Sequence, residues 1–201
     1  VDISYNEQFG ILVVDKIGNE KNGNYQAGDL TLVEAVSIAD PSKNNIIFSS
    51  NLSDKTLILE SPLQINKDLT IDGQGRNVTI SGGTKTSLFV IKGGEVNLKN
   101  LTLRDGLAKG GNGTKGTING FGPGGGGAGL GGAIAISNGN ITVDNVDFIN
   151  NHAIGGNGAP STAPKGDYLF QAGSGGGSSL GNGGKQPGRD GGERGYNGNS
   201  G

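Results

Sequence analysis

The chain has 201 residues, of which 16 are basic and 18 acidic, and its formal net charge is −2. This near-neutral balance, without a dense basic cluster, argues against a nucleic-acid-binding protein. There is no cysteine, which excludes disulfides and thiolate metal sites, and no apolar run of the roughly 18 residues needed to insert into a membrane. The absence of methionine favours a mature form or a piece of a longer chain.

The first part of the chain predicts one strand and one short helix. Residues 11–14 are Ile-Leu-Val-Val, typical of a strand, and residues 28–40 carry the helix. Thr31 and Glu34 have the spacing of a capping box, in which each residue's side chain accepts from the backbone amide of the other. Asp40-Pro41 ends the helix, because proline disfavours helical angles in the residue before it. We expect this helix to cover the exposed core of a following coil, against which the strand pairs.

From residue 46 onward, short β-branched segments separated by Gly and Asn predict strands rather than helices. These segments are 46–48, 57–59, 63–65, 69–71, 78–80 and 88–91. Residues 69–71 lie 27 positions before the similar residues 96–98, which is close to one turn of a wide parallel β-helix.

A longer repeat gives the strongest signal, because residues 96–113 recur without a gap at 141–158. Such a fixed apolar pattern predicts a solenoid, in which each unit buries its apolar side by stacking on a neighbour. Asn100 and Asn145 interrupt the alternation at equivalent places, so we expect two short strands joined at each Asn. Stacked coils would bring the two Asn side chains together as a hydrogen-bonded ladder.

Two sets of residues resemble known bacterial families. Residues 28–40, followed by 46–48, resemble the CSLREAI-type segment that opens many secreted bacterial β-helix proteins, although Leu30 and Val33 stand where that segment has cysteine and arginine. Gly131-Gly132-Ala133-Ile134 and Phe148-Ile149-Asn150-Asn151 resemble the GGA(I/L/V) and FxxN motifs of polymorphic outer-membrane proteins, which are surface autotransporters and adhesins. The resemblance implies a pectate-lyase-like fold and an extracellular or bacterial cell-surface location.

The predicted fold is therefore all-β: a right-handed parallel β-helix with a short N-terminal capping helix and long glycine-rich loops. Residues 1–45 would form the N-terminal strand and capping helix. Residues 46–158 would form the coils, with a glycine-rich insertion at 106–131. Residues 159–201 would be a glycine-rich extension, a loop of a longer β-helix that continues beyond Gly201 with another coil.

Glycine is concentrated in two places, with 14 of the 42 glycines between Gly106 and Gly132 and 17 between Gly155 and Gly201. Both clusters begin at the same corner of the repeat, which predicts insertions from one edge of the coil. Such a composition is compatible with a disordered tether. We favour polyglycine segments that lie side by side as extended, hydrogen-bonded helices and offer an assembly surface. The candidate contact glycines are Gly110, Gly111, Gly113, Gly124, Gly125, Gly126, Gly127, Gly155, Gly156, Gly158, Gly175, Gly176 and Gly177.

The sequence assigns no catalytic residue and no cofactor. His152 is the only histidine, and we expect it to cap a turn at the repeat corner. Asp72, Asp105, Asp144 and Asp147 could bind calcium or form an acid–base pair. We expect Asp144 and Asp147 on different strands, however, and no coil groups Asp with Lys and Arg. Calcium stays an open alternative.

Two functions remain open. The favoured one is a non-catalytic extracellular or cell-surface scaffold for adhesion or self-assembly, with the glycine loops as contact surface. The alternative is a fragment of a polysaccharide lyase or glycoside hydrolase of the pectate-lyase-like fold. The expected partners are other copies or further coils of the same chain, or else a polysaccharide or host surface.

Overall fold

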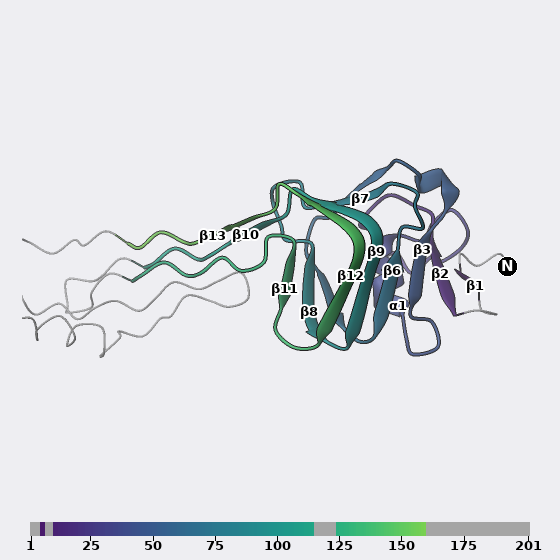
Figure 1. The fold of residues 1–201 in the computed structure, drawn as a ribbon, viewed down its shortest axis with the longest axis horizontal. Coiled ribbons are helices and arrows are strands. Elements are labelled where there is room, and N and C mark those ends of the chain that lie inside the picture. Colours follow the sequence, from purple (N-terminus) through teal and green to yellow (C-terminus); the bar gives the residue numbers. More distant parts are fainter. Residues whose placement is uncertain (1–4, 7–9, 115–123, 160–201) are drawn as a thin grey trace, which may run out of the picture. The chain divides into compact units, whose positions relative to one another are not determined.

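The computed structural model describes residues 5–6, 10–114 and 124–159. The chain divides into two compact units, and each unit is made of two separate stretches of the sequence (Figure 1). The strand unit comprises Val1–Leu107 and Gly131–His152, and the glycine unit comprises Ala108–Leu130 and Ala153–Gly201. The described part of the predicted insertion, residues 108–114 and 124–130, thus lies in the same unit as residues 153–159.

The strand unit is all-β, with parallel sheets and one helix. Its main stack contains, in order, the parallel strands β2 (Ile11–Val14), β3 (Asn45–Phe48), β6 (Leu69–Asp72), β9 (Glu95–Arg104) and β12 (Asn140–Ile149) (Figure 1). A second parallel stack contains β5 (Leu63–Asn66), β8 (Phe89–Gly93) and β11 (Ile134–Ile136). Strand β4 (Thr56–Ile58) pairs with β7 (Val78–Ser81), which pairs with the second half of β9. Strand β1 (Tyr5–Asn6) pairs antiparallel with β2.

The core forms because successive passes of the chain place similar residues in register. Leu12, Ile46, Ile71 and Leu98 are paired down the main stack, and each is fully buried. Since side chains alternate between the two faces of a strand, one apolar residue in two suffices to fill the inner face. The predicted offsets of 27 and 45 positions are both confirmed by the strand register.

The prediction of two short strands on either side of each Asn is wrong. Strands β9 and β12 each run for 10 residues through Asn100 and Asn145. Both Asn residues have φ of 52°, a left-handed conformation that Asn tolerates better than most residues. In β9 and β12 a single residue therefore bends the chain, and strand pairing resumes with the next residue. In the preceding pass of the chain, residues 73–77 separate β6 from β7. Asp144 and Asp147 consequently lie on one strand.

Helix α1 (Leu32–Ile38) begins with the expected capping box. Thr31 Oγ1 accepts from Glu34 N at 3.2 Å, and Glu34 Oε2 accepts from Thr31 N at 3.2 Å. The helix packs against β2 and β5, so it lies over the first strand of the second stack. Its residues Leu32, Ala35 and Val36 join the core. The capping helix expected from the sequence is therefore present.

Two lysines that sequence analysis did not identify donate hydrogen bonds in this part of the chain. Lys67 Nζ donates to three carbonyl oxygens at the end of α1, those of Val36, Ser37 and Ala39, at 3.2, 3.3 and 2.6 Å. A cation at this end also complements the helix dipole. Lys16 Nζ donates to Asp29 Oδ1 at 2.5 Å, and this hydrogen bond lowers the pKa of Asp29.

Substituting Thr31 by alanine tests the helix cap. Thr31→Ala removes the side-chain acceptor for Glu34 N, and we expect the free energy of unfolding in urea to fall by about 1–2 kcal/mol. Ser49→Ala is the matched control, because Ser49 precedes the 3₁₀ helix η1 (Ser50–Leu52) without a side-chain cap hydrogen bond. We expect the control to change stability by less than ~0.5 kcal/mol. Equal losses in both variants would contradict the cap.

Among the residues that the structure describes, no helix is long and apolar enough to cross a membrane.

Candidate contact surface

Three glycine-rich segments of the glycine unit, residues 108–114, 124–130 and 153–159, lie side by side. The first two residues of 108–114 and of 153–159 belong to the short paired strands β10 (Leu107–Lys109) and β13 (His152–Ile154). Backbone hydrogen bonds join every pair of the three segments. They run from Gly110 N to Ile154 O and Gly113 N to Asn157 O, from Gly127 N to Gly111 O and Gly124 N to Thr114 O, and from Gly156 N to Gly127 O and Ala159 N to Gly124 O, all at 2.7 to 2.9 Å.

These hydrogen bonds repeat every three residues, as the donor pairs Gly110 and Gly113 or Gly124 and Gly127 show. Neighbouring strands in a parallel sheet would repeat every two residues, whereas an extended polyproline-II-like helix has three residues per turn. The acceptors show that 108–114 and 153–159 run in one direction and 124–130 in the other. The three segments therefore pack as extended polyglycine helices, as expected from the sequence, although within one chain.

The interior of this packing admits no side chain. A Cβ atom at Gly110 would lie 2.1 Å from Gly127 O, and one at Gly126 would lie 1.7 Å from Gly156 O. Contacts of 1.9 to 2.2 Å with backbone oxygens would also arise at Gly113, Gly129 and Gly156. In residues 108–114 and 124–130 the forbidden positions are three residues apart, as in collagen, where only glycine fits at the axis.

Of the other candidate glycines, four are exposed, two are buried and three are not described. A Cβ at Gly155 or Gly158 would come no closer than 3.6 and 3.7 Å to its nearest neighbour, which is ordinary van der Waals contact. Gly111 and Gly125 are exposed, while Gly124 and Gly127 are buried. The candidates Gly175, Gly176 and Gly177 lie outside the described residues.

The asparagine ladder expected from the sequence is present in the strand unit and is longer than expected. Asn145 Nδ2 donates to Asn100 Oδ1 at 2.8 Å, and Asn100 Nδ2 donates to Asp72 Oδ1 at 2.8 Å. Each side chain thus donates to the preceding pass. Within the described part of the chain, Asn145 Oδ1 is the terminal acceptor of this ladder.

A second asparagine fixes the end of β9, a role that sequence reasoning missed. Asn151, the last residue of the FxxN-like motif, donates from Nδ2 to Leu103 O at 2.8 Å and accepts from Gly106 N at Oδ1, also at 2.8 Å. One amide side chain therefore bonds to an acceptor near the end of β9 and to a donor in the turn that follows it. Only the 45-residue alignment places Asn151 over Gly106, so the repeat was the signal that could have revealed it.

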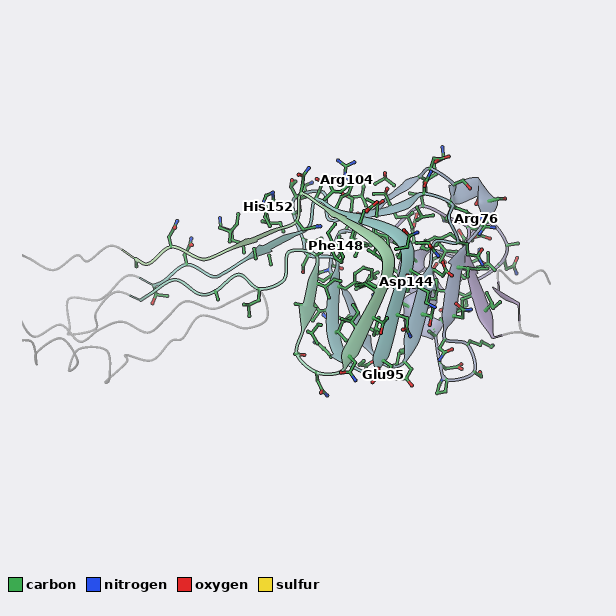
Figure 2. All side chains as sticks on the ribbon, in the orientation of Figure 1. Arg76, Glu95, Arg104, Asp144, Phe148 and His152 are labelled. Atoms are coloured by element: carbon green, nitrogen blue, oxygen red, sulfur yellow. The ribbon has the colours of Figure 1, made fainter. Side chains whose placement is uncertain are left out.

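The carboxylates and the histidine do not form a shared site. Asp72 belongs to the ladder, and Asp105 accepts from Arg104 Nε at 2.7 Å. Asp144 and Asp147 are exposed on β12, and Figure 2 shows Asp144 on this strand. His152 lies in β13 with an exposed side chain, and its backbone N–H, rather than its imidazole, bonds to Gly106 O. The described residues hold no group of three or more His, Cys, Asp or Glu arranged for a metal.

Replacing the ladder residues by glycine tests their contribution. Glycine adopts a φ of 52° without strain, so Asn100→Gly removes the side chain and leaves the bend. Because Asn100 both donates and accepts in the ladder, we expect its loss to lower the free energy of unfolding by about 1–3 kcal/mol. Asn145→Gly, which removes one hydrogen bond at an exposed site, should cost less than ~1 kcal/mol. Thermal or urea unfolding measures both, and a larger effect at Asn145 would contradict the ladder.

No protein-family model matches this chain, and neither the curated proteins nor the solved structures contain a match to it.

Proposed function

We propose that the chain is a non-catalytic scaffold at the cell surface or outside the cell, with the glycine unit as its contact surface for self-assembly or adhesion. The observation that carries the proposal is the three-residue period of the hydrogen bonds in residues 108–114, 124–130 and 153–159, with side-chain exclusion at the same period in the first two segments. A bacterial source and a relation to the surface proteins resembled by the motifs are part of this proposal.

Glycine in this pattern is suited to building contacts rather than to filling space. Ordering a residue opposes folding by about 1–2 kcal/mol, and glycine loses the most backbone freedom. Packing of backbone against backbone offsets this loss inside the unit. Outward positions such as Gly155 and Gly158 leave further backbone open to a close approach by another extended chain.

The strand unit would supply the rigid support. We propose that its stacks are walls of a right-handed parallel β-helix, because between successive main-stack strands from β3 to β12 the chain adds one strand to the second stack. The repeat returns the chain to the same corner after β9 and after β12, where β10 and β13 begin. Two glycine segments therefore leave from equivalent positions.

The dispersion of the carboxylates supports a non-catalytic role over a glycoside hydrolase. Glycoside hydrolases use two carboxylates on either side of the scissile bond. Asp72 and Asp105 are engaged with neighbouring side chains, and Asp144 and Asp147 lie exposed on one strand.

The oligomeric state of the purified full chain tests the proposal. We expect light scattering and negative-stain microscopy to show particles larger than a monomer. Gly155→Arg places a bulky charge on the outward side of the glycine unit and should shift these particles towards the monomer. Thr56→Arg, on an exposed position of β4, is the control and should not.

The outcomes separate the alternatives. A monomer that binds a polysaccharide without cleaving it would leave adhesion as the function. A monomer that cleaves an acidic polysaccharide would overturn the scaffold and favour the enzyme.

A further inference from the structure

Among the residues that the structure describes, the last pass of the strand unit, β11 and β12, has a partly exposed apolar side. Ile134, Ile136, Ile141, Val143, Val146 and Phe148 are in register with the buried residues Phe89, Ile91, Val96, Leu98, Leu101 and Leu103. Val143 and Phe148 are 47% and 49% exposed, whereas Leu98 and Leu103 are fully buried. We call the first six residues the end face. A core face open to this extent marks an interaction site.

The end face also carries polar groups that specify a strand as its partner. Strand β12 pairs with β9 and forms the edge of the main stack among the described strands. The backbone N–H and C=O groups on its other side are therefore available to pair with a further strand. Asn145 Oδ1 is the terminal acceptor of the ladder. Beside it, Asp144 is exposed and has Lys99 as its partner in β9.

We propose that β12 binds a further parallel strand with the pattern of β9, supplied by a coil of a partner protein. That strand has apolar residues over Val143 and Phe148, a side-chain amide over Asn145 and a basic residue over Asp144. Backbone hydrogen bonds provide affinity, and the alternate side chains provide specificity, as in other cases of strand addition. This inference concerns the strand unit and holds whether or not the glycine unit mediates assembly.

Continuity with the β9–β12 pairing favours this partner over a second copy of the same end face. Nine residue pairs join β9 and β12 in parallel, on both sides of the Asn bend. Two copies of β12 would bring their exposed Asp144 and Asp147 side chains together, and like charges on neighbouring strands are destabilising. Stacking of the end face on the opposite end is disfavoured by α1, which covers β2 and β5 there.

A peptide with the sequence of residues 95–106 is the probe, with blocked termini and a fluorescent label. We expect it to bind the full chain with one-to-one stoichiometry in fluorescence anisotropy. Replacing its Asn100 by Gly, which keeps the bend, should weaken binding about fivefold, as for one lost hydrogen bond of ~1 kcal/mol. Replacing its Leu98 and Leu103 by Ser should weaken binding at least ~30-fold, because both apolar contacts are lost.

A peptide with the sequence of residues 140–151 is the matched control for charge. It keeps the apolar pattern and the Asn but places Asp over Asp144 and Asp147, so it should bind more weakly than the first peptide, and added salt should narrow the difference. Because all substitutions are in the peptides, the folding of the chain is not at issue.

Disulfide trapping tests the orientation, since the chain has no cysteine of its own. Asn140→Cys in the chain should trap the first peptide through a cysteine at its N-terminus and not through one at its C-terminus. Absence of binding by the full chain would overturn the proposal, because the end face would then be covered by another segment or another copy. Equal binding of all peptides, or trapping at the C-terminus, would overturn it as well.

Discussion

Gly156→Ala will unpack the glycine unit, whereas Gly155→Ala will leave it intact. A Cβ at Gly156 would lie 1.9 Å from Gly111 O, but a Cβ at Gly155 would lie 3.6 Å from Gly127 O. Backbone oxygens cannot rotate away as side chains do, so the segment 153–159 must separate from 108–114. We expect a loss of local stability at or above the ~3 kcal/mol upper range for overpacking.

Hydrogen exchange followed by mass spectrometry measures this effect segment by segment. In Gly156→Ala, the amides of residues 108–114 and 153–159 should exchange roughly 100-fold faster, as expected when the free energy of local opening falls by ~3 kcal/mol. The strands of the strand unit should keep their protection. Gly158→Ala provides a second control, since its Cβ would lie 3.7 Å from Gly124 O. Similar protection in all three variants would show that the segments do not pack with a three-residue period.

The repeat made much of the strand unit predictable from the sequence. Gap-free alignment of residues 96–113 with 141–158 anticipates the pairs Val96–Ile141 and Leu103–Phe148 that the structure contains. Such alignment works because a parallel stack conserves register, so that equal spacing in sequence becomes a direct neighbour in space. The cap at Thr31 and Glu34 was predictable for a different reason, since its hydrogen bonds span three residues.

Interactions without a fixed spacing were not predictable. Lys67 reaches the end of α1 from 28 to 31 residues away, and no local pattern indicates this. Asp72 joins the ladder because the earlier pass has a turn where the later passes have one Asn. The continuous strands β9 and β12 were missed for another reason. A break in the alternation of apolar and polar residues predicts a bend, but it does not indicate whether the strand pairing also stops there.

The glycine unit was predictable in kind and not in detail. Composition indicates extended glycine segments, and their common origin at the repeat corner indicates that they leave together. Which glycines face inward depends on the relative shift of three segments. Gly155 and Gly156 are adjacent glycines that the sequence does not distinguish. Only the relative shift of the segments determines that a Cβ would clash at Gly156 and not at Gly155. The handedness of the proposed β-helix is not predictable from the repeat either. It depends on how the chain crosses from one stack to the other, whereas the repeat indicates only which strands pair within a stack.

Leu103→Ala will lower the free energy of unfolding more than Phe148→Ala, although the phenylalanine side chain is the larger of the two. The two residues are partners in register, but Leu103 is fully buried and Phe148 is 49% exposed at the end face. Leu103→Ala should lower the free energy of unfolding by about 2–5 kcal/mol, through lost burial and the cavity left behind. A buried Phe would cost about 3–5 kcal/mol on the same substitution.

For Phe148→Ala we expect a loss of less than ~1.5 kcal/mol, because roughly half of the ring's transfer free energy is realised and solvent can fill the space. Urea unfolding of the two variants measures the difference, and a fluorescent dye that binds exposed apolar surface should bind the wild type more than Phe148→Ala. Addition of the peptide with the sequence of residues 95–106 should raise the stability of the wild type and should increase the loss caused by Phe148→Ala, since the ring becomes buried only when a further strand is bound. A loss of 3 kcal/mol or more at Phe148 without peptide would mean that the end face is already covered in solution.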